Sequence, residues 1–358
     1  MKVLRIVNSI THASAPYHQF TLPLVDTQDI TICAYFDSVL QPHPKLDYYQ
    51  AEGRLGKFLK NLKGVLQKDD FDVVHVHHVQ VGFLFIIVSL LFKPIMFSRS
   101  IITVHTSYNL LTVSQRFFLF CCFIFFRKIV ACSLSSLDSI PVYLKRISNS
   151  RLMYITNGCN VDKIEDTVKH FRPMKNKTVP FEIIYVASLK PGKNHTVLLQ
   201  AFKKWDCHHA ILRLIGGGSL LHRLEEEALA LGCADRVIFS GVQPRDVVLK
   251  AMVSADLFIS PSEGEGLPIA VIEAMVCGCP VVLSDIPPHR EIVSDNKFVP
   301  LLPPHDVEGF VKAIHGLAAM PQKQIHEITQ KVRAHAIKNF SMKNMLDDYL
   351  DVYQQIAT

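Results

Sequence analysis

The stretch Ser262–Met275, with the sequence SEGEGLPIAVIEAM, decides the predicted fold of this chain. It lies between two apolar runs, residues 256–260 and 280–283, and this order predicts a strand, a turn, a short helix and a second strand. Pro268 suits the first helical turn, where no amide hydrogen bond is needed, and Gly278 suits the position after the helix end. The stretch is therefore expected to join two neighbouring strands of a parallel sheet.

Two carboxylates mark this predicted loop and helix. Glu265 in the loop and Glu273 in the helix are eight residues apart, or roughly 12 Å along a helix axis. The amides of a helix N-terminus attract anions such as phosphate, and ligands of open parallel sheets bind beyond the carboxyl ends of the strands. A phosphate-holding helix start beside two carboxylates, which accept hydrogen bonds from hydroxyls, suits a sugar joined to a nucleotide diphosphate.

The chain has the size and pattern of a two-domain α/β protein. It has 358 residues, of which 49% are hydrophobic and 20% charged. Apolar runs alternate with longer helical stretches, which predicts strands at residues 3–8, 29–34, 73–77, 101–105, 128–132, 182–187, 210–215 and 236–239. The polar stretch 161–180 is the predicted linker. We therefore expect an N-terminal domain at residues 1–165, a second domain at 178–338 and a C-terminal helix at 339–358.

Residues 265–268, 273–275 and 278–282 together resemble the E-x7-E signature of the family-four retaining glycosyltransferases (glycosyl transferases group 1). The resemblance implies a GT-B fold, in which two Rossmann-like domains face each other across a cleft. It also implies that the second domain holds a nucleotide-sugar donor, that the first holds the acceptor, and that the C-terminal helix crosses back to the first domain.

The same resemblance implies roles for individual residues. Glu265 would contact the donor sugar as a catalytic residue, Glu273 would bind the ribose hydroxyls, and the amides around Gly266 and Leu267 would stabilise charge on the leaving diphosphate. Retaining glycosidases use two carboxyl groups about 5–5.5 Å apart, and Glu265 and Glu273 are too far apart for that. We therefore expect attack from the face of the departing phosphate, with this phosphate helping to remove the acceptor proton.

A second turn carries a candidate diphosphate site. Residues 188–195 follow a predicted strand and resemble the family's Arg-Leu-x-x-x-Lys turn, whose Arg and Lys hold the donor diphosphate. Lys193 matches the Lys, whereas Ser188 stands where Arg is usual. Either Lys190 supplies the missing charge or the diphosphate is held more weakly.

Two glycine-containing turns fall where the family places its nucleotide-facing loops. Residues 216–218 are three consecutive glycines after a strand, and they allow the backbone to approach a ligand closely. Gly241 and Val242 follow the next strand, where the family's backbone meets the nucleobase. Gly218 and Val242 are therefore expected donor-binding residues.

Histidines follow two predicted strands of the first domain. Alternating histidines such as His75 and His77 can ligate a metal, but no Asp, Glu or Cys accompanies them locally. His105 aligns with a family histidine that faces the donor sugar across the cleft, and it is predicted to be a catalytic residue. His75 and His77 are assigned either structural or acceptor-side roles. No metal and no cofactor besides the nucleotide-sugar substrate are expected.

Positive charge is concentrated in the first part of the chain. The net charge is +6, and residues 1–150 contain 15 Lys or Arg against 9 Asp or Glu, which favours an anionic partner. A two-faced helix is predicted at 54–68, either packed on the core with a solvated basic face or lying on anionic lipid with Phe58 and Leu62 in the interface. The apolar stretches 81–92 and 117–126 are short of the roughly 20 residues that span a membrane, and we expect them to be buried helices.

These observations lead to one predicted function and two alternatives. The nine cysteines form no C-x-x-C pair and the N-terminus reads as a strand, so we expect a cytoplasmic protein. The two-faced helix at 54–68 and the positive charge of residues 1–150 lead us to expect it at the inner face of the cytoplasmic membrane, as a peripheral protein. It would transfer a sugar to a lipid-linked or polysaccharide acceptor in cell-surface glycan synthesis. A sugar-nucleotide epimerase is the enzymatic alternative. A nucleic-acid-binding protein is the other, and it is disfavoured because no aromatic residues are interleaved with the basic run. The donor base, the sugar and the acceptor stay open.

Overall fold

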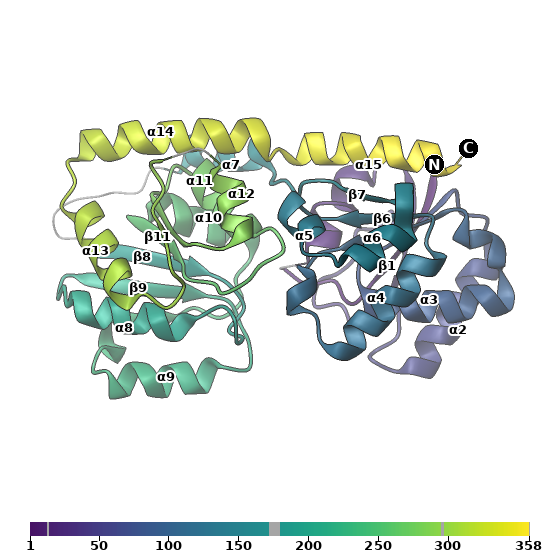
Figure 1. The fold of residues 1–358 in the computed structure, drawn as a ribbon, viewed down its shortest axis with the longest axis horizontal. Coiled ribbons are helices and arrows are strands. Elements are labelled where there is room, and N and C mark those ends of the chain that lie inside the picture. The colour runs from purple at the N-terminus through teal and green to yellow at the C-terminus, as the bar shows by residue number, and fades with distance from the viewer. Residues whose placement is uncertain (13, 172–179, 295–296, 358) are drawn as a thin grey trace. The chain divides into compact units, whose positions relative to one another are not determined.

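The protein, seen in a computed structural model, divides into two compact units (Figure 1). The structure describes residues 1–12, 14–171, 180–294 and 297–357. The first unit contains residues 1–157 and 342–358, and the second contains residues 158–341. Each unit is built around one parallel sheet with helical connections. The predicted α/β class is therefore confirmed in both units.

The first sheet has seven strands in the order β3-β2-β1-β4-β5-β6-β7. Its strands are β1 (Lys2–Val7), β2 (Asp29–Ala34), β3 (Asp47–Gln50), β4 (Val73–Val76), β5 (Ser100–Val104), β6 (Lys128–Ala131) and β7 (Leu152–Tyr154). Five of these agree with the predicted strands to within a residue at each end. The short strands β3 and β7 were not predicted, and they form the two outer edges of the sheet.

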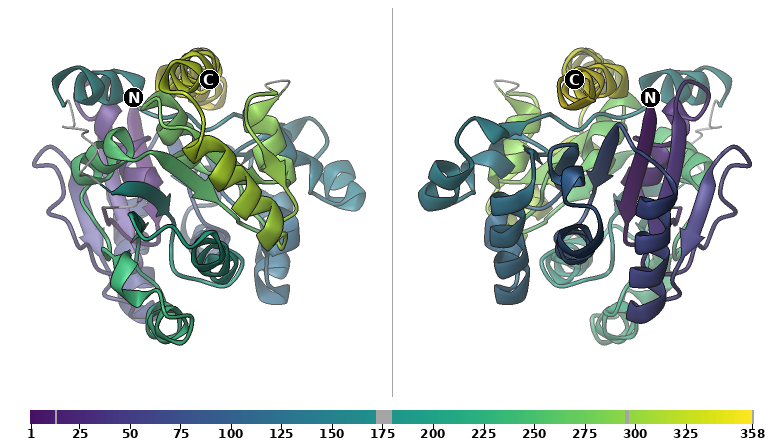
Figure 2. Two further views of the ribbon diagram at one scale, coloured as in Figure 1. Left: turned by 90° about the vertical axis from the view of Figure 1, so that its left-hand side faces the viewer. Right: turned by 90° about the vertical axis from the view of Figure 1, so that its right-hand side faces the viewer.

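Helices cover both faces of the first sheet. They are α1 (Ala15–His18), η1 (Leu22–Leu24), α2 (Leu55–Lys68), α3 (Val79–Phe92), η2 (Pro94–Phe97), η3 (Tyr108–Leu110), α4 (Val113–Phe125), α5 (Leu134–Asp138), α6 (Val142–Ser148), η4 (Asn149–Arg151) and α15 (Met342–Ala357). One apolar core joins the sheet to α2, α3 and α4, and a second core joins the opposite face to α15 through Tyr349 and Tyr353. The right-hand view in Figure 2 shows α15, in yellow, on the face of this sheet opposite α2, α3 and α4.

The structure decides what covers three predicted helices of the first unit. The side chains of Phe58 and Leu62 on α2 are fully buried in the core, so the core-packed alternative is confirmed and the alternative in which they dip into a lipid interface is wrong. The segments 81–92 and 117–126 do form helices, α3 and α4, but the prediction that these helices are buried is wrong for one side of each. Ile87, Leu90 and Leu91 on α3 are exposed, and α4 exposes a matching row of apolar side chains.

The second sheet has six strands in the order β10-β9-β8-β11-β12-β13. Its strands are β8 (Phe181–Val186), β9 (Ala210–Ile215), β10 (Val237–Phe239), β11 (Leu257–Ser260), β12 (Val281–Ser284) and β13 (Leu301–Leu302). The helices of this unit are α7 (Val161–His170), α8 (His195–Trp205), α9 (Leu221–Ala230), η5 (Ala234–Arg236), α10 (Arg245–Ser254), α11 (Ile269–Val276), α12 (Pro287–Val293), α13 (Val307–Ala318) and α14 (Gln322–Asn339). The chain order reverses between β8 and β11, which are hydrogen-bonded neighbours.

The predicted linker at 161–180 is wrong for its first half. Residues 161–170 form α7, whose N-cap residue Asn160 accepts a hydrogen bond from the Lys163 amide through its side chain. Ile164 is buried, and α7 packs against α10 and α11 within the second unit. The polar composition of this segment reflects the solvent face of a helix that buries a single large apolar side chain. Residues 172–179 of the predicted linker lie outside the described residues.

Candidate active site

The carboxyl edge of the second sheet holds the predicted donor site. The chain order reverses between β8 and β11, and in open parallel sheets a ligand binds beyond the strand ends at such a reversal. The loop after β8 carries Lys193, and the loop after β11 carries Glu265. Two predicted site residues that are 72 positions apart in the sequence are therefore brought to one place by the sheet topology.

Lys193 and Glu265 form an ion pair within a hydrogen-bond network. The Ser262 hydroxyl donates to the Oε1 atom of Glu265 at 2.8 Å, and it lies 2.8 Å from the Tyr185 hydroxyl. The Tyr185 hydroxyl lies 3.1 Å from the backbone carbonyl of Lys193, to which it donates. Burial raises the pKa of Tyr185. A neutral phenol therefore ties the two loops together, and the Glu265 carboxylate is held in place by a cation and a hydroxyl.

A buried histidine, His289, is connected to this network through Ser284. The Nδ1 atom of His289 lies 2.8 Å from the backbone carbonyl of Ser284, and the Ser284 hydroxyl donates to the carbonyl of Ser262 at 2.5 Å. Burial lowers the pKa of His289 to about 4. The imidazole is therefore neutral near pH 7 and holds Ser284, which in turn bonds the backbone of the Glu265 loop.

The second carboxylate of the motif has its own cationic partner. Glu273 lies on α11 with 2% of its surface exposed, and its carboxylate is paired with the guanidinium of Arg245. Arg245 is the first residue of α10 and follows the turn that contains Val242. A carboxylate this deeply buried needs a counter-charge to stay ionised. Arg245 supplies that charge at a position 28 residues earlier in the chain.

The glycine turn after β9 lies directly on the loop after β8. A Cβ atom on Gly216 would be 1.9 Å from the carbonyl oxygen of Ala187, and one on Gly218 would be 2.2 Å from that of Leu189. A Cβ on Gly217 would be 3.0 Å from a methyl group of Val242. Close backbone contact therefore explains the glycines, and it brings the turns that carry Gly218 and Val242 beside the loop that carries Ser188. Their role in donor binding stays a prediction.

Two further predicted donor residues lie just before α11. Gly266 and Leu267 are buried in the loop that leads into this helix, and Pro268 is its N-cap residue. They are therefore next to the positive end of the α11 dipole, where an anion is stabilised. Ser188 is half-buried and Lys190 is exposed on the loop after β8.

Histidines form a separate cluster at the carboxyl edge of the first sheet. The Nε2 atom of His105 lies 3.2 Å from Nδ1 of His77, whose ring stacks on that of His75 at 3.9 Å between centroids. Burial lowers the pKa of His105 to about 3. Beside them, the fully buried Arg5 contacts His75 and the Tyr353 hydroxyl of α15 at 3.2 and 3.1 Å. His75 is therefore a structural residue that links strands β1 and β4 to α15, while the catalytic role of His105 stays a prediction.

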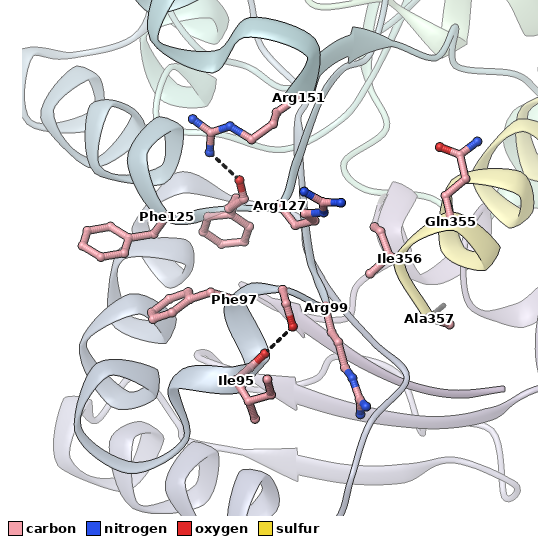
Figure 3. Close-up of a pocket in the computed structure, with 11 residues that line it drawn as sticks. Ile95, Phe97, Arg99, Phe125, Arg127, Arg151, Gln355, Ile356 and Ala357 are labelled. Atoms are coloured by element: carbon pink, nitrogen blue, oxygen red, sulfur yellow. Dashed lines mark hydrogen bonds between the residues drawn. The ribbon is translucent and has the colours of Figure 1, made fainter.

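A cavity of about 570 Å³ lies at the opposite edge of the first sheet (Figure 3). It is lined by residues that precede β5, β6 and β7, together with the end of α15. Arg151 and Arg99 donate to backbone carbonyls, and Figure 3 shows the guanidinium groups of Arg99, Arg127 and Arg151 pointing in different directions. The cavity therefore lacks a converging set of cations for one anion.

Among the described residues, no three or more His, Cys, Asp or Glu side chains are grouped so that they could hold a metal ion. The residues that analysis of the sequence missed in the second unit are Tyr185, Arg245 and His289. Ser262 was part of the quoted motif but had no assigned role. Each acts through a contact between separate loops or helices, and no local pattern marks such a contact.

Comparison with known proteins places this site in a family. Residues 166–335 match the model of the glycosyl transferases group 1. The second unit belongs to the group 1 glycosyltransferases. The family predicted from Glu265, Glu273 and the residues around them is thereby confirmed, and it covers the whole donor site described above.

The names of two curated relatives of this chain include a lipid. Phosphatidyl-myo-inositol mannosyltransferase of Mycobacterium leprae is 30% identical over 210 residues, which is 57% of this chain and 54% of that protein. Alpha-monoglucosyldiacylglycerol synthase of Streptococcus pneumoniae is 32% identical over 173 residues, or 47% of this chain and 38% of that protein. The chain thus matches about half or less of the length of these relatives.

A solved structure extends the likeness to the whole chain. Anabaena HepE in complex with UDP-glucose has a TM-score of 0.80 at 17% identity, covering 99% of this chain and 100% of that one. At this identity the likeness shows the fold alone. It confirms the predicted GT-B fold, with its two Rossmann-like domains.

Proposed function

We propose that this chain is a retaining glycosyltransferase that moves a hexosyl group from a nucleoside diphosphate sugar to a hydroxyl acceptor. The observation that carries the proposal is the Lys193–Glu265 ion pair at the chain reversal of the second sheet. A cation and a fixed carboxylate at this place suit the two ends of a sugar diphosphate. The Lys193 ammonium binds the diphosphate, and Glu265 accepts hydrogen bonds from the sugar hydroxyls.

The reaction is proposed to proceed on one face of the sugar. The bond between the anomeric carbon and the diphosphate oxygen breaks while the acceptor oxygen bonds to the same face of that carbon. The acceptor proton passes to the departing phosphate oxygen, and the amides of Gly266 and Leu267 stabilise the negative charge of the diphosphate. The support for this route is that Glu273 is buried in an ion pair with Arg245. It is therefore not available as a second catalytic carboxylate beside Glu265.

The proposed acceptor is a lipid-linked or polysaccharide intermediate in cell-surface glycan synthesis, reached at the cytoplasmic face of the membrane. Two of the relatives have a lipid in their names. Among the described residues, no helix has the length and apolar character needed to cross a bilayer. The compared proteins give no support to a sugar-nucleotide epimerase. Such an enzyme would release an epimerised sugar in the absence of any acceptor, and this outcome separates the two activities.

The test uses the purified full chain with UDP-, GDP- and ADP-sugars and a panel of lipid-linked acceptors. Transfer is followed by mass spectrometry, and the anomeric configuration of the product is read by NMR. Glu265→Ala is expected to slow turnover by about 100-fold or more, as the loss of a group that stabilises the transition state does. Glu263→Ala, which removes an exposed carboxylate two residues away, is the matched control. Full activity in Glu265→Ala, or an inverted product, would overturn the proposal.

A further inference from the structure

An apolar surface on the first unit has no covering element. Helix α4 exposes Val113, Phe117, Phe120 and Ile124, which are spaced by three or four residues and therefore share one side of the helix. Helix α3 and the following turn η2 expose Ile87, Leu90, Leu91, Phe92 and Ile95. We call these nine residues the α3–α4 surface. Val113 is 84% exposed and Leu91 is 69% exposed, so these side chains lie well outside the core.

The two helices form one continuous surface because they pack closely along their length. Gly82 allows this packing, since a Cβ atom there would be 3.1 Å from the Cys122 sulfur and 3.1 Å from a methyl group of Ile102. Near the start of both helices, the Phe83 ring lies 5.9 Å from that of Phe117 and 4.8 Å from that of Phe118. The exposed rows of α3 and α4 are therefore neighbours. Contiguous exposed apolar surfaces of this kind mark interaction sites.

The charge around this surface favours an anionic partner. Residues 73–137, which include both helices, contain five Lys or Arg and no Asp or Glu. Arg127 is exposed just after α4, and the Lys63 ammonium of α2 lies 4.2 Å from the centre of the Phe92 ring. Lys93 is paired with Asp70, which lies outside this segment. The apolar side chains therefore have cationic groups at their border, and their own helices carry no carboxylate to repel an anion.

We infer that the α3–α4 surface docks on an anionic lipid bilayer, with its apolar side chains in the interface and Lys63 and Arg127 at the level of the headgroups. A second copy of the chain is the less suitable occupant, because pairing two such surfaces would bring cationic segments together. Helix α3 has 14 residues, fewer than the roughly 20 needed to span a bilayer, so it lies on the membrane. The use of this contact rests on the proposed lipid-linked acceptor, whereas lipid binding itself does not require glycosyl transfer.

The test is co-sedimentation of the full chain with vesicles of phosphatidylcholine alone or mixed with an equal part of phosphatidylglycerol. The wild type is expected to bind the anionic vesicles, and the binding should weaken as salt is added. Leu91→Gln/Ile124→Gln, at sites 69% and 46% exposed, should lower the affinity about tenfold or more. Lys63→Glu/Arg127→Glu should have a similar effect on anionic vesicles only.

The matched control is Leu229→Gln/Ile238→Gln, which makes the same changes at sites 73% and 37% exposed in the second unit. It should bind vesicles as the wild type does. Hydrogen exchange of the backbone amides of both sheets shows that both units of each variant are folded. Vesicle binding by Leu91→Gln/Ile124→Gln at wild-type affinity would overturn the inference. A wild type that ignores vesicles but dimerises through this surface would also overturn it, in favour of a second copy. Because vesicle binding is read without any donor, a failure of glycosyl transfer leaves this result interpretable.

Discussion

Arg245 and Glu273 form an ion pair that joins the start of α10 to the interior of α11. Glu273 is the second carboxylate of the motif that identified the family, and it is buried. The ribose hydroxyls of the proposed donor are neutral and could not replace the charge of Arg245, so we expect the ion pair to persist in the donor complex. Arg245 therefore fixes Glu273 in its ionised, hydrogen-bond-accepting form.

The first prediction concerns this pair. Glu273→Ala should abolish the preference of the protein for the nucleoside diphosphate found in the donor screen over its 2′,3′-dideoxy analogue, because the ribose hydroxyls lose their acceptor. Arg245→Met should weaken binding of that nucleoside diphosphate by about tenfold or more at pH 6.5, and the loss should shrink as the pH rises, because a buried carboxyl without a counter-charge takes up a proton. Isothermal titration calorimetry at several pH values measures both effects. Arg245→Lys keeps the charge and serves as the control. If the loss of nucleotide affinity in Arg245→Met did not change with pH, the role of Arg245 in positioning Glu273 would be contradicted.

The second prediction concerns the diphosphate. Lys193→Ala should weaken binding of a nucleoside diphosphate by at least about tenfold, since a charge-assisted hydrogen bond contributes about 1.5–3 kcal/mol. Binding of the bare nucleoside should be unchanged because it carries no phosphate. The same measurement on Lys190→Ala decides whether Lys190 replaces the arginine for which Ser188 stands. Equal weakening of nucleoside and diphosphate by Lys193→Ala would show that the residue only maintains the loop.

The third prediction tests the contact between the glycine turn and the loop after β8. Gly218→Ala should destabilise the second unit by about 1–3 kcal/mol, because the added methyl group meets the carbonyl of Leu189 and the backbone has to move. Trp205 on α8 is the only tryptophan of the chain, so its fluorescence reports unfolding of this unit. Gly316→Ala on α13, where a Cβ atom meets nothing within 4 Å, should instead be neutral or stabilise by up to about 1 kcal/mol. Equal effects of the two variants would refute the packing argument.

The fourth prediction is a loss of stability at acid pH. Burial lowers the pKa of His289 and of His195 to about 4, against 6.5 for a free histidine. Between these values the unfolded chain binds protons that the folded unit does not, so the free energy of unfolding falls as the pH falls from about 6.5 toward 4. Each histidine contributes up to about 1.4 kcal/mol per pH unit. Urea titrations followed by Trp205 fluorescence measure the slope, and His289→Asn should reduce it by about half. A slope unchanged by His289→Asn would mean that this histidine is protonated in the folded unit.

Much of the fold could be predicted because local patterns of apolar and polar residues indicate its strands and helices. Buried parallel strands are continuous apolar runs, and residues 29–34 and 210–215 match β2 and β9 to the residue. The short edge strands β3 and β7 have no such run, since an edge strand buries less apolar surface. The polar stretch at 161–170 was taken for a linker because α7 buries little beyond Ile164. A helix with one large apolar contact resembles a loop in composition.

Some residues of the candidate site could also be predicted from the sequence, and others could not. Lys193, Glu265 and Glu273 could be proposed from the sequence because they match a family motif whose residues stand at fixed spacings, whatever surrounds them. Tyr185 and Arg245 could not, because each acts on a group 77 or 28 residues away, and only the strand order brings these groups together.

What covers an amphipathic helix was likewise decided by the tertiary structure alone. The sequence by itself determined that α2 has an apolar and a basic side, and that α3 and α4 are apolar. The tertiary structure buried Phe58 and Leu62 of α2 and left Leu91 and Val113 of α3 and α4 in solvent. The physical reason is that the hydrophobic effect has no direction. A pattern of side chains fixes how much apolar surface a helix presents, and only the packing of the whole unit fixes what that surface meets.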